Sequence, residues 1–193
     1  MSAAPPGRPD WVGGVSLREI VAADGGMLDA WRRDPLVAGE FNDFGPSKGP
    51  TYAERLAAGS IVGDDGGALI VEVDGAPVGN VSWHRVAYGP NVESGAWNVG
   101  ISLLPEARGH GTGWRAQRLL AEWLLSRTDV NRVEASTDVA NVAEQRSLEK
   151  AGYVREGVLR GAQHRSQGWH DLVGYSFLRA DLDAPPPAGR PQS

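Results

Sequence analysis

Cysteine is missing from this sequence, and so is any long apolar run. Without cysteine, the chain has no disulfide, no thiolate ligand for a metal and no cysteine nucleophile. A transmembrane helix requires about 18 or more consecutive apolar residues, and the chain has no such run, so we predict no membrane partner. Residues 1–9 contain no apolar segment of the kind found in secretory signals, and we expect a cytoplasmic location.

Positive charge is also scarce. The 193 residues carry a net charge of −5 at pH 7, and only two of the 19 basic residues, Lys48 and Lys150, are lysines. A broad nucleic-acid-binding surface carries many Lys and Arg residues, so we predict no nucleic-acid partner. Because His110, His164 and His170 show no metal-ligand spacing, we also predict no metal site.

Length and composition indicate one globular domain. The chain is long enough to bury a substantial core, and its 41% hydrophobic and 22% charged residues are ordinary for a soluble protein. Residues 1–12 and 184–193 are rich in Pro, Gly and Ala, so we predict that both are flexible tails. We therefore expect the folded domain to span residues 13–183.

Between these tails, helical and strand patterns are mixed. We expect strands over Val15–Ile20, Ala68–Val73, Pro77–Val86, Trp97–Leu104, Arg132–Thr137, Tyr153–Leu159 and His170–Leu178. We expect helices over Gly25–Asp34, Thr51–Ala58, Gly113–Arg127 and Val142–Ala151. The pair Asp74-Gly75 favours a hairpin between the second and third strands. This order predicts the α/β class, with a single mixed sheet of about seven strands flanked by about four helices.

The central feature is the glycine-rich turn Arg108-Gly109-His110-Gly111-Thr112-Gly113, which joins an apolar strand to an amphipathic helix. Glycines leave the backbone N–H groups accessible, and the helix start adds unpaired N–H groups and a partial positive charge. This arrangement, with Arg108 beside it, predicts an anion site. A P-loop would need lysine where Trp114 stands, and a dinucleotide loop would need G-x-G-x-x-G spacing. A turn without a ligand remains the alternative.

Two segments resemble motifs of the GNAT N-acetyltransferase superfamily. The turn is similar to its R/Q-x-x-G-x-G/A acyl-CoA loop, and 141–153 resembles its N-x-x-S-x-x-x-L-E-K-x-G-F segment. Residues 155–176 are typical of the branch that contains the ribosomal-protein alanine N-acetyltransferases. The resemblance implies a GNAT-like fold in which acetyl-CoA lies where the strands Trp97–Leu104 and Arg132–Thr137 splay apart.

The resemblance further implies acetyl transfer to a primary amine, of a small molecule or of a peptide N-terminus, by direct attack in a ternary complex. The residues that it implies for acetyl-CoA are Ser102, Leu103, Leu104, Arg108, Gly109, His110, Gly111, Thr112, Gly113 and Asn141. It places Phe41, Asp43 and Phe44 on the acceptor side, although these residues also suit a hydrophobic plug under a loop. A homodimer is expected to be compatible with the family. A CoA-binding sensor without turnover and a longer acyl donor are the alternatives.

The expected proton-handling residues are missing. Many members carry a glutamate at the position of Asn98 and a tyrosine at that of Leu148, and the ribosomal-protein branch has a serine at that of Glu144. Asn98 is a candidate for holding the amine or a water, with an inert strand residue as the alternative. Glu144 is a candidate base or cation-binding group, with a capping box to Asn141 as the alternative.

Two more residues are candidate bases. Glu93 lies in the loop before the central strand and would act through water. The alternative is a solvated loop carboxylate without a catalytic role. His84 has a suitable ordinary pKa, whereas a satisfied histidine at the end of the sheet is its alternative. Tyr153 is expected to pack in the core.

Overall fold

The computed structural model describes residues 13–45, 49–59 and 61–184. The predicted tails therefore lie outside the described residues, except for Ala184. The strands are β1 (Val15–Glu19), β2 (Gly66–Val73), β3 (Ala76–Ala87), β4 (Gly95–Leu103), β5 (Arg132–Asp138), β6 (Val154–Arg165) and β7 (Gly168–Leu178). The helices are α1 (Gly25–Arg33), α2 (Pro35–Ala38), α3 (Tyr52–Ala57), α4 (Thr112–Arg127) and α5 (Val142–Ala151).

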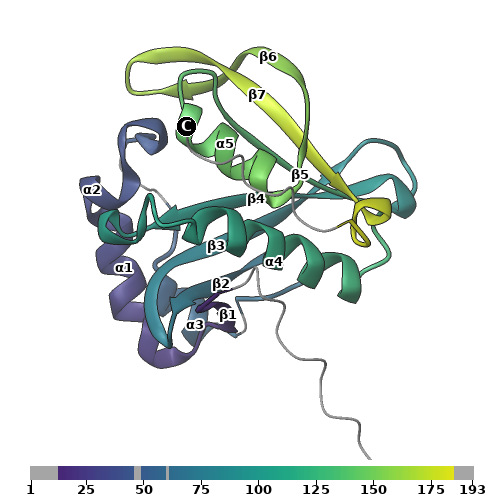
Figure 1. The fold of residues 1–193 in the computed structure, drawn as a ribbon. Helices are drawn as coiled ribbons and strands as arrows, with labels where there is room; N and C mark the ends of the chain where they lie inside the picture. Colours follow the sequence, from purple (N-terminus) through teal and green to yellow (C-terminus); the bar gives the residue numbers. More distant parts are fainter. Residues whose placement is uncertain (1–12, 46–48, 60, 185–193) are drawn as a thin grey trace, which may run out of the picture.

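The seven strands form one mixed sheet in the order β1-β2-β3-β4-β5-β7-β6 (Figure 1). The predicted α/β class and the seven strands are confirmed. The β2–β3 hairpin turns at Asp74 and Gly75, whose φ angles of 50° and 84° suit the predicted tight turn. Each of the four predicted helices is present. The structure also has a helix that was not predicted, α2, which is a single turn beginning at Pro35. It is capped by the Asp34 side chain, which accepts from the Leu36 N–H at 2.9 Å.

The pair β4 and β5 is the one parallel pair in the described sheet, and its ladder is short. Trp97 pairs with Val133 and Asn98 pairs with Glu134, and the described register goes no further. By contrast, β3 pairs with β4 along the whole of β4. The backbone edges of β4 after Asn98 and of β5 after Glu134 therefore face a gap. This confirms the splayed strand pair that the resemblance implies.

Helix α4 packs against β1, β3, β4 and β5, and α5 packs against α4, β5 and β6. The amphipathic character predicted for α4 is confirmed: Ala116 and Leu120 are fully buried, and the Trp123 ring lies 5.1 Å from that of Trp83 on β3. This packing fixes the start of α4 beside the open end of the gap. The small helices α1, α2 and α3 gather at one end of the sheet (Figure 1).

The hairpin of β6 and β7 is longer than predicted. The sequence predicts a strand that ends at Leu159, whereas β6 continues to Arg165. Residues 160–165 lack an apolar alternation, but they pair with β7 after a register shift between Leu159 and Gln163. The long hairpin therefore reaches the end of the η3 turn (Glu40–Asn42), because the Ser166 N–H donates to the carbonyl of the next residue, Asp43, at 3.3 Å.

None of the described helices is long and apolar enough to cross a membrane.

Candidate active site

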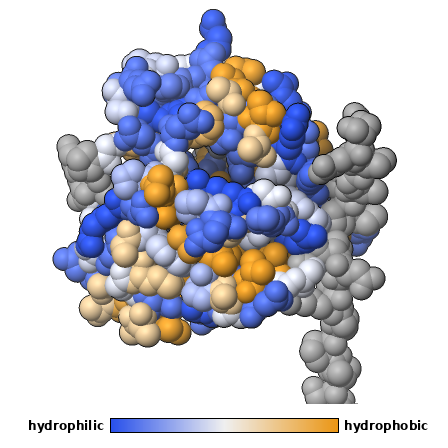
Figure 2. All heavy atoms as spheres, turned by 60° about the vertical axis from the view of Figure 1, so that its left-hand side comes forward, coloured by the Kyte–Doolittle hydropathy of each residue, from blue (hydrophilic) through white to orange (hydrophobic). Residues whose placement is uncertain are grey.

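A cavity of about 600 Å³ fills the gap between β4 and β5. Its walls are the segment 37–42, the end of β4, the glycine turn, the end of β5 and one side of α5. Figure 2 shows this face of the molecule hollowed between an upper and a lower part, with hydrophilic residues along the hollow. The volume is within the range of small-molecule and cofactor sites. The cavity therefore joins the two sequence motifs, which lie about 30 residues apart, in one site.

The glycine turn lies at one end of this cavity, and Gly109, Gly111 and Gly113 all line it. Gly109 and Gly111 have φ angles of 79° and 80°, a left-handed conformation that side chains other than glycine rarely adopt. Helix α4 begins directly afterwards, so its first N–H groups have no partner within the helix. A Cβ atom at Gly113 would lie 3.0 Å from the Ser147 Oγ on α5. The turn thus supplies accessible amides in a narrow space, which suits a phosphate group.

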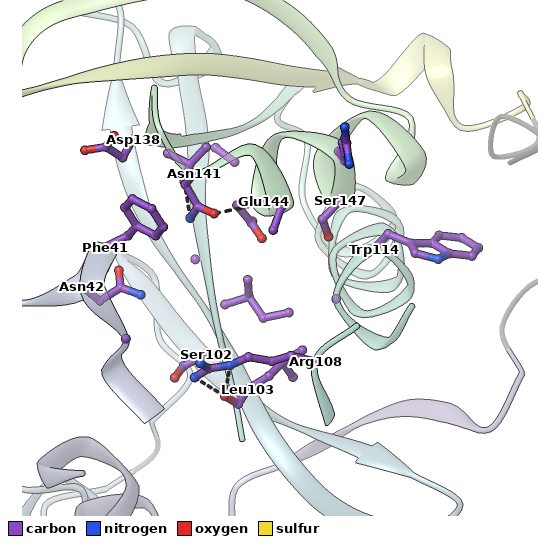
Figure 3. Close-up of a pocket in the computed structure, with 18 of the residues that line it drawn as sticks. Phe41, Asn42, Ser102, Leu103, Arg108, Trp114, Asp138, Asn141, Glu144 and Ser147 are labelled. Carbon is purple, nitrogen blue, oxygen red and sulfur yellow. Dashed lines mark hydrogen bonds between the residues drawn. The ribbon is translucent and has the colours of Figure 1, made fainter. Parts of the chain in front are cut away.

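Arg108 differs from the expected anion ligand. Its guanidinium donates to the carbonyl of Leu103 (2.7 and 3.0 Å) and to those of Leu36 (2.9 Å) and Val37 (2.7 Å). These bonds tie α2 to the end of β4, and Figure 3 shows those to Leu103. Arg108 thus borders the cavity, and its Nε and Nη2 donate to backbone carbonyls. Arg108 therefore acts as a structural clamp at the cavity wall, and its predicted role as an anion ligand stays a prediction.

Three other residues predicted for the cofactor do not line the cavity. The Leu104 N–H donates to the Val78 carbonyl at 2.9 Å, Thr112 is buried with 4% of its surface exposed, and the His110 side chain is exposed. Ser102, Leu103 and Asn141 do line it. In the turn, the three glycines line the cavity, whereas His110 and Thr112, which alternate with them, do not.

Asn141 and Glu144 form only half of the predicted capping box. The Asn141 side-chain oxygen accepts from the Glu144 N–H at 3.2 Å. The Glu144 carboxylate turns toward the cavity instead (Figure 3) and accepts from the Gln117 Nε2 on α4. The Ser147 Oγ donates to the other atom of the same amide, the Gln117 Oε1, at 2.9 Å. Burial raises the pKa of Glu144 to about 7, although the contact with Gln117 opposes the shift.

The other candidate catalytic residues lie outside this cavity. Asn98 lines a second, smaller cavity of about 260 Å³. His84 pairs with Asn98 across β3 and β4, but it is exposed and lines neither cavity. Glu93 lies in the exposed η4 turn (Val92–Ser94), where its carboxylate accepts from the Asn91 Nδ2 at 3.2 Å. These positions favour the non-catalytic alternatives, a solvated loop carboxylate for Glu93 and a histidine at the end of the sheet for His84.

Of the three residues predicted for the acceptor side, one lines the larger cavity and two do not. Phe41 lines the larger cavity, whereas Asp43 and Phe44 do not, and 55% of Phe44 is exposed. Asp43 instead accepts from the Ser166 Oγ in the β6–β7 turn. The guanidinium of Arg165 lies 6.0 Å from the centre of the Phe41 ring. This segment therefore ties the hairpin to the cavity wall.

Sequence reasoning missed several lining residues. Arg146 and Lys150 lie on α5 at the rim of the cavity, one turn apart and exposed, where they suit the phosphates of a large anion. Their spacing of four in the sequence was a usable signal. The pair of Asp138 on β5 and Arg165 was not readable, because the two residues meet only through the sheet. Both are buried, and the His170 Nδ1 lies 3.1 Å from the Asp138 carboxylate.

No group of three or more His, Asp or Glu residues in the described ranges is arranged to hold a metal ion.

The fold and the site define a class of protein. The model of the acetyltransferase (GNAT) domain family matches residues 15–154. The chain therefore belongs to the GNAT acetyltransferases and is an acyltransferase.

Particular relatives agree with this class. The putative ribosomal N-acetyltransferase YdaF of Bacillus subtilis (strain 168) is 28% identical over 145 residues, which cover 72% of this chain and 75% of the relative. Mycobacterium smegmatis RimJ in complex with CoA-disulfide has a similar fold, with a TM-score of 0.68, 18% identity and coverage of 89% of this chain and 85% of that chain. The aminoglycoside acetyltransferase AAC(6')-Ib in complex with coenzyme A and kanamycin has a TM-score of 0.64, 21% identity and coverage of 86% and 95%.

Proposed function

We propose that the protein transfers an acetyl group from acetyl-CoA to a primary amine within a ternary complex. The observation that carries this proposal is the cavity in the gap between β4 and β5, which ends at the amides of the glycine turn. Two solved structures of similar fold contain CoA-disulfide or coenzyme A, which supports the same donor. The donor supplies an activated thioester, and the protein supplies position and polar groups.

The residues of this chain fit such a donor. The amides around Gly109, Gly111 and Gly113 would hold the pyrophosphate, and Arg146 and Lys150 at the rim would meet the remaining phosphate charge. The unpaired edge of β4 at Ser102 and Leu103 would hold the amide groups of the pantetheine arm. Asn141 faces the same space and is fixed by its Nδ2, which donates to the Thr137 Oγ1 at 3.0 Å.

Glu144 takes the place of the missing acid in this proposal. It lies on α5 one turn before Leu148, where many family members carry a tyrosine, and its carboxyl faces the cavity. Because burial raises its pKa to about 7, a large fraction is protonated at neutral pH. Glu144 is thus suited to give a proton to a departing thiolate.

The acceptor is a primary amine, on a peptide N-terminus or on a small molecule. The ribosomal N-acetyltransferase relative favours the first class and the aminoglycoside complex the second. A panel of peptides with free N-termini and of aminoglycosides, assayed by thiol release, separates the two. Replacing acetyl-CoA by longer acyl-CoA donors in the same assay tests the donor length. A cytoplasmic location and a homodimer remain predictions.

The donor site is tested by Gly113→Asp. The new carboxylate would lie in the first turn of α4, where it interacts favourably with the helix dipole but repels a pyrophosphate. We expect the affinity for CoA, measured by calorimetry, to fall at least about tenfold below that of the matched variant Gly113→Asn, which makes the same tight contact with the Ser147 Oγ. The neutral Gly113→Asn has nearly the same size and is the matched control, which should lose less. Equal CoA affinity in all three proteins, or no binding by the wild type, would refute the proposed donor site.

A further inference from the structure

The second cavity lies on the other side of the point where β4 and β5 separate. It has a volume of about 260 Å³ and is lined by residues of β4, β5, β6, β7 and the loop after β3. Ala135 and Ser136 on β5 line both cavities, so the smaller cavity adjoins the larger one at this point. The structure thus offers two compartments that meet at the start of the gap.

The most buried charged group in this second compartment is Glu134, which is 9% exposed. Its carboxylate accepts from the Tyr88 hydroxyl at 2.6 Å and from the Asn98 Nδ2 at 3.3 Å. The Arg132 Nε donates to it at 2.9 Å. Each of these partners is a donor, so the contacts suit an ionised carboxylate.

The sheet register fixes where Glu134 lies relative to the gap. Asn98 and Glu134 form the last described pair of the parallel ladder, and the strands separate directly after them. A donor that runs along the gap toward this pair ends beside both side chains. Asn98 occupies the position at which many family members carry a glutamate, and Glu134 is the residue that faces it on the neighbouring strand.

The charges of the second compartment favour a cation. Its lining holds two carboxylates, Glu134 and Glu156, and one guanidinium, that of Arg132. Arg132 pairs with both, at 2.9 Å to Glu134 and 2.6 Å to Glu156. One negative charge is therefore left over, which a single ammonium group would balance.

We propose that Glu134 binds the ammonium group of the acceptor in this compartment and accepts its proton. This inference rests on the proposed acetyl transfer. Glu134 takes one proton and passes it to solvent past the exposed Tyr88 and Glu156. The free amine then bonds to the thioester carbon while the carbon–sulfur bond breaks and leaves its electron pair on sulfur. The second proton lost by nitrogen balances the proton that sulfur gains.

The test is the pH dependence of acetyl transfer in Glu134→Gln, which removes the charge and keeps the size. At pH 7 we expect kcat/KM for an accepted amine to fall about 100-fold or more, with CoA affinity unchanged. The defect should shrink at pH values above the pKa of the amine, where the acceptor arrives neutral. A merely structural role would give the same loss at every pH.

A matched control is Glu72→Gln. Glu72 also pairs with an arginine, Arg18 at 2.7 Å, and has a similarly buried side chain, 17% exposed against 11% for Glu134. Glu72 lines neither cavity, so the kcat/KM of Glu72→Gln should stay at the wild-type value.

If Glu134→Gln folds poorly, Tyr88→Phe removes one donor to the carboxylate at an exposed position. That variant should lower kcat/KM at pH 7 by a smaller factor than Glu134→Gln, with CoA affinity unchanged.

A rescue variant sharpens the test. Because Asn98 faces Glu134, the exchange Asn98→Glu with Glu134→Gln returns a carboxylate to the same place and should restore part of the lost kcat/KM. Wild-type kcat/KM in Glu134→Gln, or an equal loss at every pH, overturns the inference and leaves the proposed function standing. A wild-type protein that acetylates no amine on the panel refutes the proposed function itself.

Discussion

The raised pKa of Glu144 makes a prediction about stability that is independent of any substrate. The carboxyl has an ordinary pKa of 4.5 in the unfolded chain and about 7 in the folded protein. The folded state therefore binds more protons than the unfolded state between these values, and stability falls as the pH rises through this window. Below pH 4.5 the penalty is absent, and above pH 7 it is complete.

The size of the effect follows from the shift. A difference of about 2.5 pKa units at about 1.4 kcal/mol per unit corresponds to roughly 3 kcal/mol once the carboxyl is fully ionised. Glu144→Gln removes this penalty and keeps an oxygen that accepts from the Gln117 Nε2. Relative to the wild type, the variant should gain about 1 kcal/mol at pH 5 and about 3 kcal/mol at pH 8.

The assay is urea unfolding of both proteins at pH 5 and pH 8, with free energies of unfolding taken from linear extrapolation. Glu106→Gln, at an exposed position in the η5 turn (Pro105–Ala107), is the control and should change stability by less than about 0.5 kcal/mol at either pH. A gain for Glu144→Gln that is the same at both pH values, or a loss at pH 8, would refute the reasoning.

Three further variants test other parts of the site. Asp138→Asn leaves the buried Arg165 without its charge partner, and chemical denaturation should show a loss of about 3–5 kcal/mol; a loss below about 1 kcal/mol would contradict the pairing. Arg108→Lys keeps the charge but loses most of the carbonyl bonds, so stability should fall by about 1–2 kcal/mol while calorimetry gives a CoA affinity within about threefold of wild type. A large loss of affinity with intact stability would instead support Arg108 as an anion ligand. The Tyr153 hydroxyl is buried and has no hydrogen-bond partner among the described residues, so Tyr153→Phe should raise the free energy of unfolding by about 1 kcal/mol; a loss would reveal a partner.

The fold was largely readable because its signals are local. Alternation of apolar residues marks the strands, and the stripe of Ala116, Leu120 and Leu124 marks α4. The second half of β6 was missed because residues 160–165 carry no apolar face, and their pairing depends on β7 rather than on their own pattern. The helix α2 was missed because its four residues, Pro35–Ala38, are too few for a periodic signal.

The site was readable only in part, for a related reason. The glycine turn depends on backbone conformation, which Gly109 and Gly111 themselves dictate. The destination of a long side chain depends on distant segments instead. Arg108 bonds to the carbonyls of Leu36 and Val37, more than 70 residues away, and no local pattern announces those partners.

The position of Glu134 shows how a sheet can keep a chemical group while the residue that carries it changes. Neighbouring strands lie about 4.8 Å apart, and side chains that are directly paired point to the same face of the sheet. A carboxylate on β5 at Glu134 therefore reaches nearly the same volume as one on β4 at Asn98, and the two side chains are in fact hydrogen-bonded. Aligned residue by residue, the chain lacks the family's glutamate, but in three dimensions it has a carboxylate beside the same gap. The register of paired strands, rather than sequence position, is thus the proper frame for finding the base.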